Sequence, residues 1–337
     1  RHNRTKIVAV CIALWSAATV MCGVASSILG FALSRIGVGV GEAGGTPGAN
    51  SILSDYFPAS RRPMALTIFS LGAPIGAWLS YEFAGAVAHN YGWKSVFWVL
   101  GLPGFLVGLL IWFTIKEPAR GQMDAEIQEV APSVKETTKF LFEQSSAVHV
   151  MLASALTALW GWGLIYFTPS FLQRIHHLDA EQAGLVTGNI HLFGGGIATL
   201  LTGWLLTRRF FDDPRRTVWL MGVIVGLATF ASIGIYWTRD LDTARALCWI
   251  FIPAIYFYIG PCFGILNNLA MPRMRAMFCA ATLFVANVGN LIIAPVYVGS
   301  LSNWFDPLHQ GTAESLRLAL LCLTPVGFWA TLHYFWA

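Results

Sequence analysis

Charged residues are scarce in this sequence. Asp, Glu, Lys and Arg make up 11% of its 337 residues, whereas a typical globular domain carries about 25%. A soluble protein of this size would need polar residues along every helix to make a wetted face. Here the charges gather in short clusters between long apolar runs. This pattern indicates a chain whose solvent is a lipid bilayer.

Motifs for metal binding, catalysis and nucleic-acid recognition are also lacking. The six cysteines lie in apolar segments without a CxxC or a zinc-like His/Cys spacing. No HExxH, GxSxG or paired-carboxylate cluster occurs in the apolar runs. The basic residues form no face interleaved with aromatic side chains. We therefore expect no metal, no cofactor, no enzyme activity and no nucleic-acid partner.

Apolar runs long enough to cross a hydrocarbon core of about 30 Å are abundant. They predict an all-α integral membrane protein with about ten transmembrane helices. The runs cover residues 7–26, 28–53, 65–88, 96–115, 148–172, 184–206, 218–237, 246–269, 278–301 and 316–336. Alternate connections place 15 of the 21 basic residues on one side, which the positive-inside rule makes cytoplasmic. Both chain ends are then cytoplasmic, and we expect a multi-pass protein of the cell (inner) membrane.

An internal repeat predicts two related halves. Residues 62–76 and 275–289 share a loop arginine and, about four turns later, a glycine. We expect halves at 1–115 and 147–337, joined by a cytoplasmic linker at 116–146 that ends in a short surface helix near 134–143. The first half then contains four helices and the second six.

The segment SRIGVGVGEAGGTPG, residues 34–48, places two charges in an apolar run. Seven residues at 100° each put Arg35 and Glu42 within about 20° of each other on a helix, about 10.5 Å apart along its axis. A charge facing lipid costs roughly 2.5 to 3.5 kcal/mol, so both should face a cavity. Pro47 should interrupt the helix. The glycines should allow close helix approach, namely Gly37, Gly39, Gly41, Gly44 and Gly45.

Two roles for the charged residues remain open at this point. Arg35 and Glu42 could form a fixed ion pair that holds the helix in place. Alternatively, Glu42 exchanges a proton as its hydration and its distance from the guanidinium change. Arg35 stays charged, so it would bind an anionic headgroup or alternately release and neutralise the Glu42 carboxylate.

Other polar residues within the apolar runs are weaker candidates for substrate binding. Interhelical hydrogen bonding is the more common use of such residues. The candidates are Asn189, His191, Tyr166 and Asn287, with Asn290, Tyr256 and Tyr258 as further possibilities. Apolar walls are expected from Leu159, Trp160, Phe193 and Phe284.

Several segments resemble the major facilitator superfamily: RIGVGVGEAGGTP, DYFPASRRPMALTIFSLGAPIG and PRMRA. The glutamate directly after the glycine run, followed by SDYFP, is most similar to the spinster branch. The resemblance covers essentially the whole chain, with the first two of twelve helices lacking. It implies two pseudo-symmetric six-helix halves around a central cavity and alternating access.

The resemblance also implies a function. Spinster-like members are coupled to protons and associated with lysophospholipids or sphingosine-1-phosphate, so a small, anionic, lipid-like substrate is expected. In that branch an aspartate on the first helix shares the proton site, and that helix is not in this chain. The expected partners are membrane lipids and protons, with the protein acting as a monomer. The alternative is an organic-anion (sugar-acid) proton symporter, whose cavity would carry more hydrogen-bonding side chains.

Overall fold

The computed structural model describes residues 3–58, 62–119, 133–208, 213–271, 274–309 and 312–337, and within these ranges the secondary structure is helical. The chain divides into two compact units. One comprises Arg1–Gly72 and Leu79–Ile127, and the other Ala73–Trp78 and Gln128–Ala337. The predicted halves and linker remain predictions, and residues 120–132 of that linker lie outside the described residues. So do five of the arginines used to predict topology, Arg1, Arg61, Arg120, Arg209 and Arg273.

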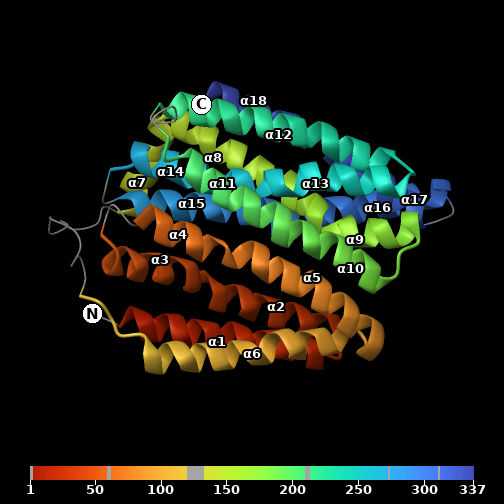
Figure 1. Ribbon diagram of the computed structural model, residues 1–337, viewed down its shortest axis with the longest axis horizontal. Coiled ribbons are helices and arrows are strands. Elements are labelled where there is room, and N and C mark those ends of the chain that lie inside the picture. Colours follow the sequence, from red (N-terminus) through yellow and green to blue (C-terminus); the bar gives the residue numbers. More distant parts are fainter. Residues whose placement is uncertain (1–2, 59–61, 120–132, 209–212, 272–273, 310–311) are drawn as a thin grey trace. The chain divides into compact units, whose positions relative to one another are not determined.

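The described part of residues 4–114 forms a series of helices. These are α1 (Arg4–Val24), α2 (Ile28–Ala43), α3 (Gly45–Tyr56), α4 (Arg62–Ser70), α5 (Gly72–Tyr91) and α6 (Trp93–Thr114). Helix α1 packs along both α6 and α2, and Figure 1 shows α1 and α6 side by side. Gly101 and Gly104 of α6 face α1, where an added Cβ would meet Val20 and Ser16. Small residues thus allow the helix backbones to approach closely.

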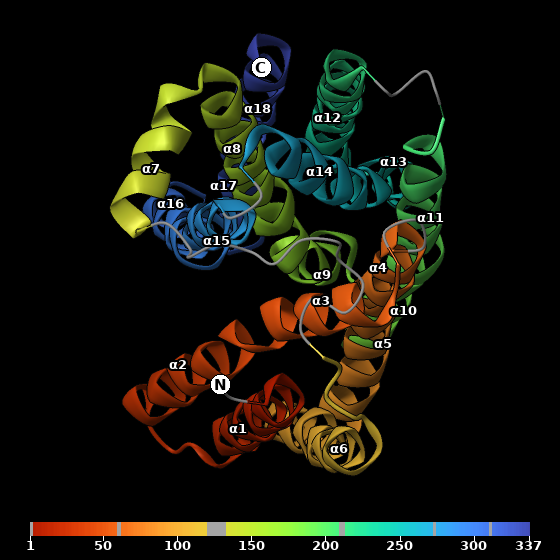
Figure 2. The same cartoon turned by 90° about the vertical axis from the view of Figure 1, so that its left-hand side faces the viewer.

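The described part of residues 134–336 forms a second helical bundle. Its α-helices are α7 (Val134–Glu143), α8 (Ser145–Thr157), α9 (Gly163–His176), α10 (Ala180–Asn189), α11 (Gly196–Leu205), α12 (Pro214–Trp237), α13 (Leu241–Phe257), α14 (Ile259–Leu269), α15 (Arg275–Asn287), α16 (Ala294–His309), α17 (Thr312–Leu323) and α18 (Val326–Trp336). Three π-helical segments link some of them: η1 (Ala158–Trp162), η2 (Ile190–Gly195) and η5 (Val288–Ile293). Helix α18 packs against α8 and α12, as the end-on view in Figure 2 shows.

The core of this second unit contains large aromatic residues with satisfied polar atoms. Trp160 is fully buried, and its indole Nε1 donates to Ser232 Oγ at 3.3 Å. Its ring also packs edge-on against Phe251. The expectation that Trp160 lines an open apolar wall is therefore wrong. Phe193 and Phe284 are 55% and 71% exposed, consistent with a place on an accessible surface.

Eight helical stretches among the described residues are long and apolar enough to cross a membrane. They are Arg4–Val24, Trp93–Thr114, Ser145–His176, Ala180–Leu205, Pro214–Trp237, Leu241–Leu269, Met277–Asp306 and Ala313–Trp336. All eight overlap predicted spans. The other two predicted spans, 28–53 and 65–88, are helical but each is interrupted, at Gly44 and at Leu71. The prediction of an all-helical membrane fold is confirmed.

Proline explains where these interruptions fall. A proline lacks the N–H that would bond to the carbonyl four residues earlier, and its ring crowds that carbonyl. Counting back four residues from Pro47 and from Pro74 gives Ala43 and Ser70, where α2 and α4 end. Pro261 stands in the same relation to Phe257, the last residue of α13. The predicted break at Pro47 is confirmed.

The predicted short helix at 134–143 is also confirmed, as α7. Ser133 caps it by accepting a hydrogen bond from the Glu136 backbone N–H, while the Glu136 carboxylate accepts from the Ser133 N–H. This reciprocal arrangement satisfies two N–H groups that the first turn would otherwise leave unpaired. Thr137 and Leu141 are buried, so α7 is amphipathic, with one face packed on the bundle.

A charged cluster joins three helix ends of the first unit. Arg4, at the start of α1, bonds through Nη1 to Asp55 near the end of α3 at 2.5 Å. Its Nε bonds to Glu117, just beyond α6, at 2.7 Å. Glu117 also accepts from the backbone N–H and the hydroxyl of Thr5, at 2.9 and 3.0 Å. The carboxylate thus lies at the positive end of the α1 dipole, where a negative charge is favoured.

The Glu117 contacts predict loss of stability in acid. Partial burial tends to raise the pKa of its carboxyl, but hydrogen bonds from Thr5 and Arg4 outweigh burial and lower the pKa below its ordinary value. The carboxylate therefore stabilises the fold fully above its ordinary pKa of 4.5, and this contribution is lost as the pH falls below that value and through the lowered pKa of the folded state. In thermal unfolding across this range, Glu117→Gln should show a smaller loss of stability than the unsubstituted protein.

Glu143→Gln is the matched control, because the Glu143 side chain is 60% exposed in a loose pair with Lys139 at 3.8 Å. Its acid profile should follow that of the unsubstituted protein. An unchanged acid profile in Glu117→Gln would contradict the assignment.

Candidate functional site

The glycines of α2 and α3 define which face of this helix pair packs on α1. A Cβ at Gly41 would lie 2.6 Å from the Trp15 backbone nitrogen, and one at Gly48 would lie 2.5 Å from Val8 Cγ2. Gly37, Gly44 and Gly45 make similar approaches to Ala18, Cys11 and Trp15. Gly39 differs, because a Cβ there would meet nothing within 4 Å. The prediction of close approach is confirmed for four of the five glycines and is wrong for Gly39.

Arg35 and Glu42 lie on the other side of α2. At 100° per residue, Arg35, Gly39 and Glu42 form one stripe, and Gly37 and Gly41, which face α1, lie roughly 120° to 160° around the helix from Arg35. Both charged side chains are exposed. The absence of a side chain at Gly39 leaves an open notch between them. The stripe thus presents a permanent cation, a gap and a titratable acid along one helix face.

Arg35 and Glu42 form no ion pair with each other or with other residues in the described part of the chain. The arrangement therefore differs from the fixed pair considered above. An unpaired arginine can bind a phosphate or carboxylate through its planar set of N–H donors. An unpaired glutamate can bind and release a proton as its surroundings change.

In the second unit, a polar aromatic cluster surrounds His191. His191 is fully buried in η2, with its Nδ1 2.8 Å from the Tyr256 hydroxyl. The Trp162 ring stacks on the imidazole at 6.4 Å between centroids and 11° between planes, and Tyr256 meets Trp162 edge-on. Tyr166, which is 42% exposed, lies 6.4 Å from Trp162 between ring centroids. Two of the predicted residues, His191 and Tyr166, are therefore joined through Trp162.

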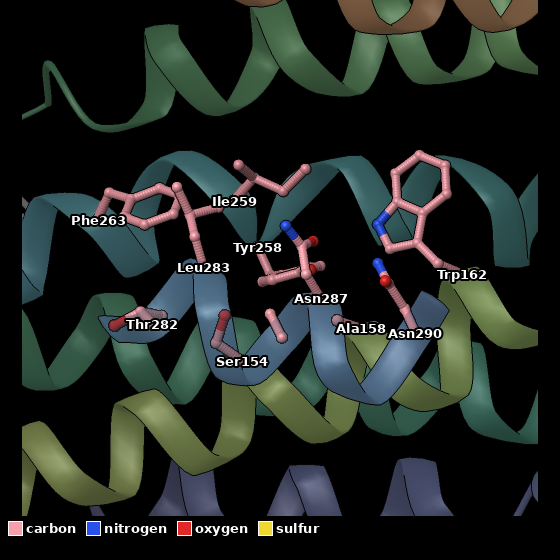
Figure 3. A pocket seen from close by; sticks show the side chains of 11 residues that line it. Ser154, Ala158, Trp162, Tyr258, Ile259, Phe263, Thr282, Leu283, Asn287 and Asn290 are labelled. Carbon is pink, nitrogen blue, oxygen red and sulfur yellow. The ribbon is translucent and has the colours of Figure 1, made fainter. Parts of the chain in front are cut away.

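Next to this cluster lies a cavity of about 120 Å³. Its lining residues come from α8, η1, α14, α15 and η5, together with Tyr258 at the junction between α13 and α14 (Figure 3). They are Ser154, Ala158, Trp162, Tyr258, Ile259, Phe263, Thr282, Leu283, Ala286, Asn287 and Asn290. The predicted residue Asn287 is among them. Trp162 belongs to both the cavity and the His191 cluster.

The remaining predicted residue, Asn189, is half-buried at the end of α10. It precedes His191 by two residues, and side chains at that separation lie on different faces of a helix. Neither Asn189 nor His191 is among the described residues that line the cavity. Both residues are candidates from the sequence, and the structure gives them different surroundings.

Each of the three π-helical segments positions one residue of these sites. Trp162 ends η1, His191 lies in η2 and Asn290 lies in η5. A π segment adds a residue to a turn, rotates the side chains that follow, and occurs often at functional sites. Gly195 assists in η2, because a Cβ there would lie 2.7 Å from the Tyr256 ring. Sequence reasoning missed Trp162 and Ser154, and the only visible signals were the glycines beside the π segments, at 161, 163 and 194–196.

No cluster of three or more His, Cys, Asp or Glu side chains suited to a metal ion occurs among the described residues. The side chains described above offer charge, hydrogen bonding and apolar contact for recognition. The sequence matches the Major Facilitator Superfamily over residues 1–294. The chain belongs to the major facilitator superfamily. It is accordingly a multi-pass integral membrane transporter and not an enzyme.

Relatives within the superfamily include several transporters. The chain is 29% identical to an MFS-type efflux pump of Mycolicibacterium smegmatis, over 94% of this chain and 72% of that protein. It is 24% identical to a probable L-galactonate transporter of Escherichia coli, over 93% of this chain and 70% of that protein. It is 29% identical to the protein spinster of Drosophila melanogaster, over 94% of this chain and 54% of that longer protein.

The crystal structure of a bacterial homologue of the human lysosomal transporter Spinster, inward-facing and unoccupied, matches this superfamily member with a TM-score of 0.82. The two are 27% identical, and the match covers 99% of this chain and 83% of the other. A structure of a bacterial Spinster homologue in an inward-facing, occupied form matches with a TM-score of 0.81 at 28% sequence identity. The resemblance to the spinster branch found in the sequence is therefore confirmed.

Proposed function

We propose that this protein moves a small, anionic amphiphile across the cell (inner) membrane by alternating access, coupled to protons. The observation that carries this proposal is the stripe on α2, where Arg35 and Glu42 are exposed on either side of the notch at Gly39. Arg35 binds the anionic headgroup, and Glu42 binds and releases the coupling proton. Similarity to a probable sphingolipid transporter of Arabidopsis thaliana, a spinster homologue 26% identical to this chain, supports the lipid-like substrate.

The second unit, taken by itself, also carries surfaces suited to an amphiphile. The exposed rings of Tyr166, Phe193 and Phe284 offer apolar contact. Asn287, Asn189 and the cluster of His191 each offer hydrogen-bonding groups. An amphiphile would place its tail along apolar side chains and its polar part near hydrogen-bond donors and acceptors.

A second candidate is an organic-acid proton symporter. The L-galactonate transporter of Escherichia coli and the gallate transporter of Pseudomonas putida are both similar to this chain, at 24% and 25% identity. An acid of that kind would use the same Arg35 for its carboxylate. It has no tail, so its affinity would depend on hydrogen bonds and not on apolar area.

Tail length separates these two candidates. Each buried CH₂ group contributes about 0.8 kcal/mol, so affinity for lysophosphatidylglycerols should rise roughly tenfold for every two carbons added. The measurement is displacement of a fluorescent lysophospholipid from the purified full-length protein by the C12, C14 and C16 homologues. Arg35→Ala should lower the affinity for all three homologues by a similar factor, because the variant loses headgroup contacts only. The order of the three affinities should stay the same. Affinity that ignores tail length and is competed by galactonate would contradict the lipid substrate and favour the organic acid.

A further inference from the structure

The cavity shown in Figure 3 is built for an uncharged polar group. None of the described residues that line it is charged. A bound carboxylate, phosphate or ammonium would lack a counter-charge there, and burying an unpaired charge is very costly. The polar groups that line the cavity are hydroxyls, amides and an indole, which recognise neutral hydrogen-bonding partners.

Asn290 supplies the strongest indication that something outside the chain binds here. Asn290 is 8% exposed, and its Oδ1 has no hydrogen-bond partner among the residues that the structure describes. A buried acceptor without a donor destabilises a fold, and native proteins rarely leave one unsatisfied. Asn290 also lies in the π-helical segment η5, an irregular backbone that is often found at functional sites. Both features are explained if a ligand brings the missing donor.

The two ends of the cavity differ in character. In Figure 3, Asn290 lies close to Trp162 at one end, while Phe263 and Leu283 lie toward the other. Ser154 and Asn287 lie between them. An occupant with a hydroxyl at one end and carbon at the other matches this polarity. A volume of about 120 Å³ limits that occupant to a small unit and excludes a whole lipid.

We propose that this cavity binds the uncharged hydroxyl-bearing part of an amphiphile, such as a glyceryl unit, and that the hydroxyl donates a hydrogen bond to Asn290 Oδ1. The site is separate from the charged stripe on α2 and has a different specificity, for a neutral donor. The inference rests on the proposed function only in taking the substrate to be amphiphilic. Uncharged probes can therefore test the cavity independently of Arg35, of Glu42 and of transport.

Two esters of the same chain length provide the test. 1-Monolauroylglycerol carries two hydroxyls, and propyl laurate has the same carbon skeleton with neither. The full-length protein in lipid nanodiscs is mixed with equal amounts of the two, and native mass spectrometry measures the ratio of bound probes. The unsubstituted protein should favour monolauroylglycerol about five- to tenfold, as expected for one hydrogen bond to an otherwise unpaired acceptor.

Asn290→Leu should reduce this preference to near one, because leucine has similar volume and no acceptor. Asn290→Ala removes the acceptor without adding bulk and should do the same, which guards against a folding or steric effect of leucine. Asn268→Leu is the matched control, since Asn268 is exposed on α14 and does not line the cavity. It should keep the full preference.

The proposal is overturned if the unsubstituted protein binds the two probes equally or binds neither. It is also overturned if both Asn290 variants keep the preference, which would mean that the cavity holds only water. Failure of the proposed function would give a different result. The affinity for lysophospholipids would then not depend on tail length, but the protein would still prefer monolauroylglycerol and the Asn290 variants would still lose that preference.

Discussion

Replacing Glu42 with glutamine should abolish the pH dependence of transport while leaving the amount of folded protein unchanged. Glutamine keeps the shape of the side chain and can still form hydrogen bonds. It cannot gain or lose a proton at the pH values at which a carboxyl group does. Glu42 is exposed and unpaired within the described residues, so its substitution leaves no partner charge uncompensated. The measurement is uptake of a lysophospholipid into proteoliposomes containing the full-length protein, with and without a proton gradient.

Glu82→Gln is the matched control for Glu42→Gln. Glu82 is a carboxyl of the same type, partly buried in α5, and lies outside the stripe of Arg35, Gly39 and Glu42. This variant should respond to the proton gradient as the unsubstituted protein does. Arg35→Ala should weaken substrate binding at every pH, because it removes the headgroup contact.

A structural role for these residues would produce a different pattern. If Arg35 and Glu42 mainly held helices together, either substitution would lower the thermal stability, because a buried charge would lose its partner. A Glu42→Gln protein that is stable and fully driven by the proton gradient would refute the coupling role.

Gly41→Ala should destabilise the first unit, whereas Gly39→Ala should not. The two glycines lie two residues apart in the same helix, so their intrinsic helix propensities are alike and alanine improves both by up to about 1 kcal/mol. At Gly41, however, the new Cβ would lie 2.6 Å from the Trp15 nitrogen and 2.8 Å from the Trp15 Cβ. Neither atom is the end of a flexible side chain, so α1 and α2 must separate.

Such overpacking costs typically about 1 to 3 kcal/mol. Thermal unfolding of the purified protein should therefore show a net loss of roughly 1 kcal/mol for Gly41→Ala, once the gain in helix propensity is subtracted. Gly39→Ala should show no loss or a small gain, because its Cβ enters open space. Equal midpoints for the two variants would contradict the packing of α2 on α1 described here.

The positions of the interrupted helices could be predicted from sequence because their causes are local. The missing N–H of Pro47 acts on its own turn, so the break at Ala43 follows from chain geometry alone. The capped start of α7 is also local, because Ser133 and Glu136 lie three residues apart. The common face of Arg35 and Glu42 follows from the helical repeat.

The outcomes that sequence reasoning missed depend on contacts between distant segments. Gly39 and Gly41 are the same residue type in one run, and only the path of α1 decides which of them it approaches. Trp160 and Trp162 are two residues apart, yet one is fully buried against Ser232 while the other lines the cavity. The π-helical segments that separate such neighbours leave no clear periodic pattern, because one extra residue in a turn is stabilised by packing and not by the local sequence.

The sequence by itself determined that this chain is a helical membrane protein and that Arg35 and Glu42 lie on the same helix. Scarce charge and apolar runs of about 20 residues allow few other solutions in a bilayer, where each backbone group must be satisfied within its own segment. Only the tertiary structure decided which polar groups have no partner within the described part of the chain, as at Asn290, Arg35 and Glu42. The physical reason is that a hydrogen bond or ion pair depends on what lies within about 3 to 4 Å, and those neighbours come from helices far apart in the chain.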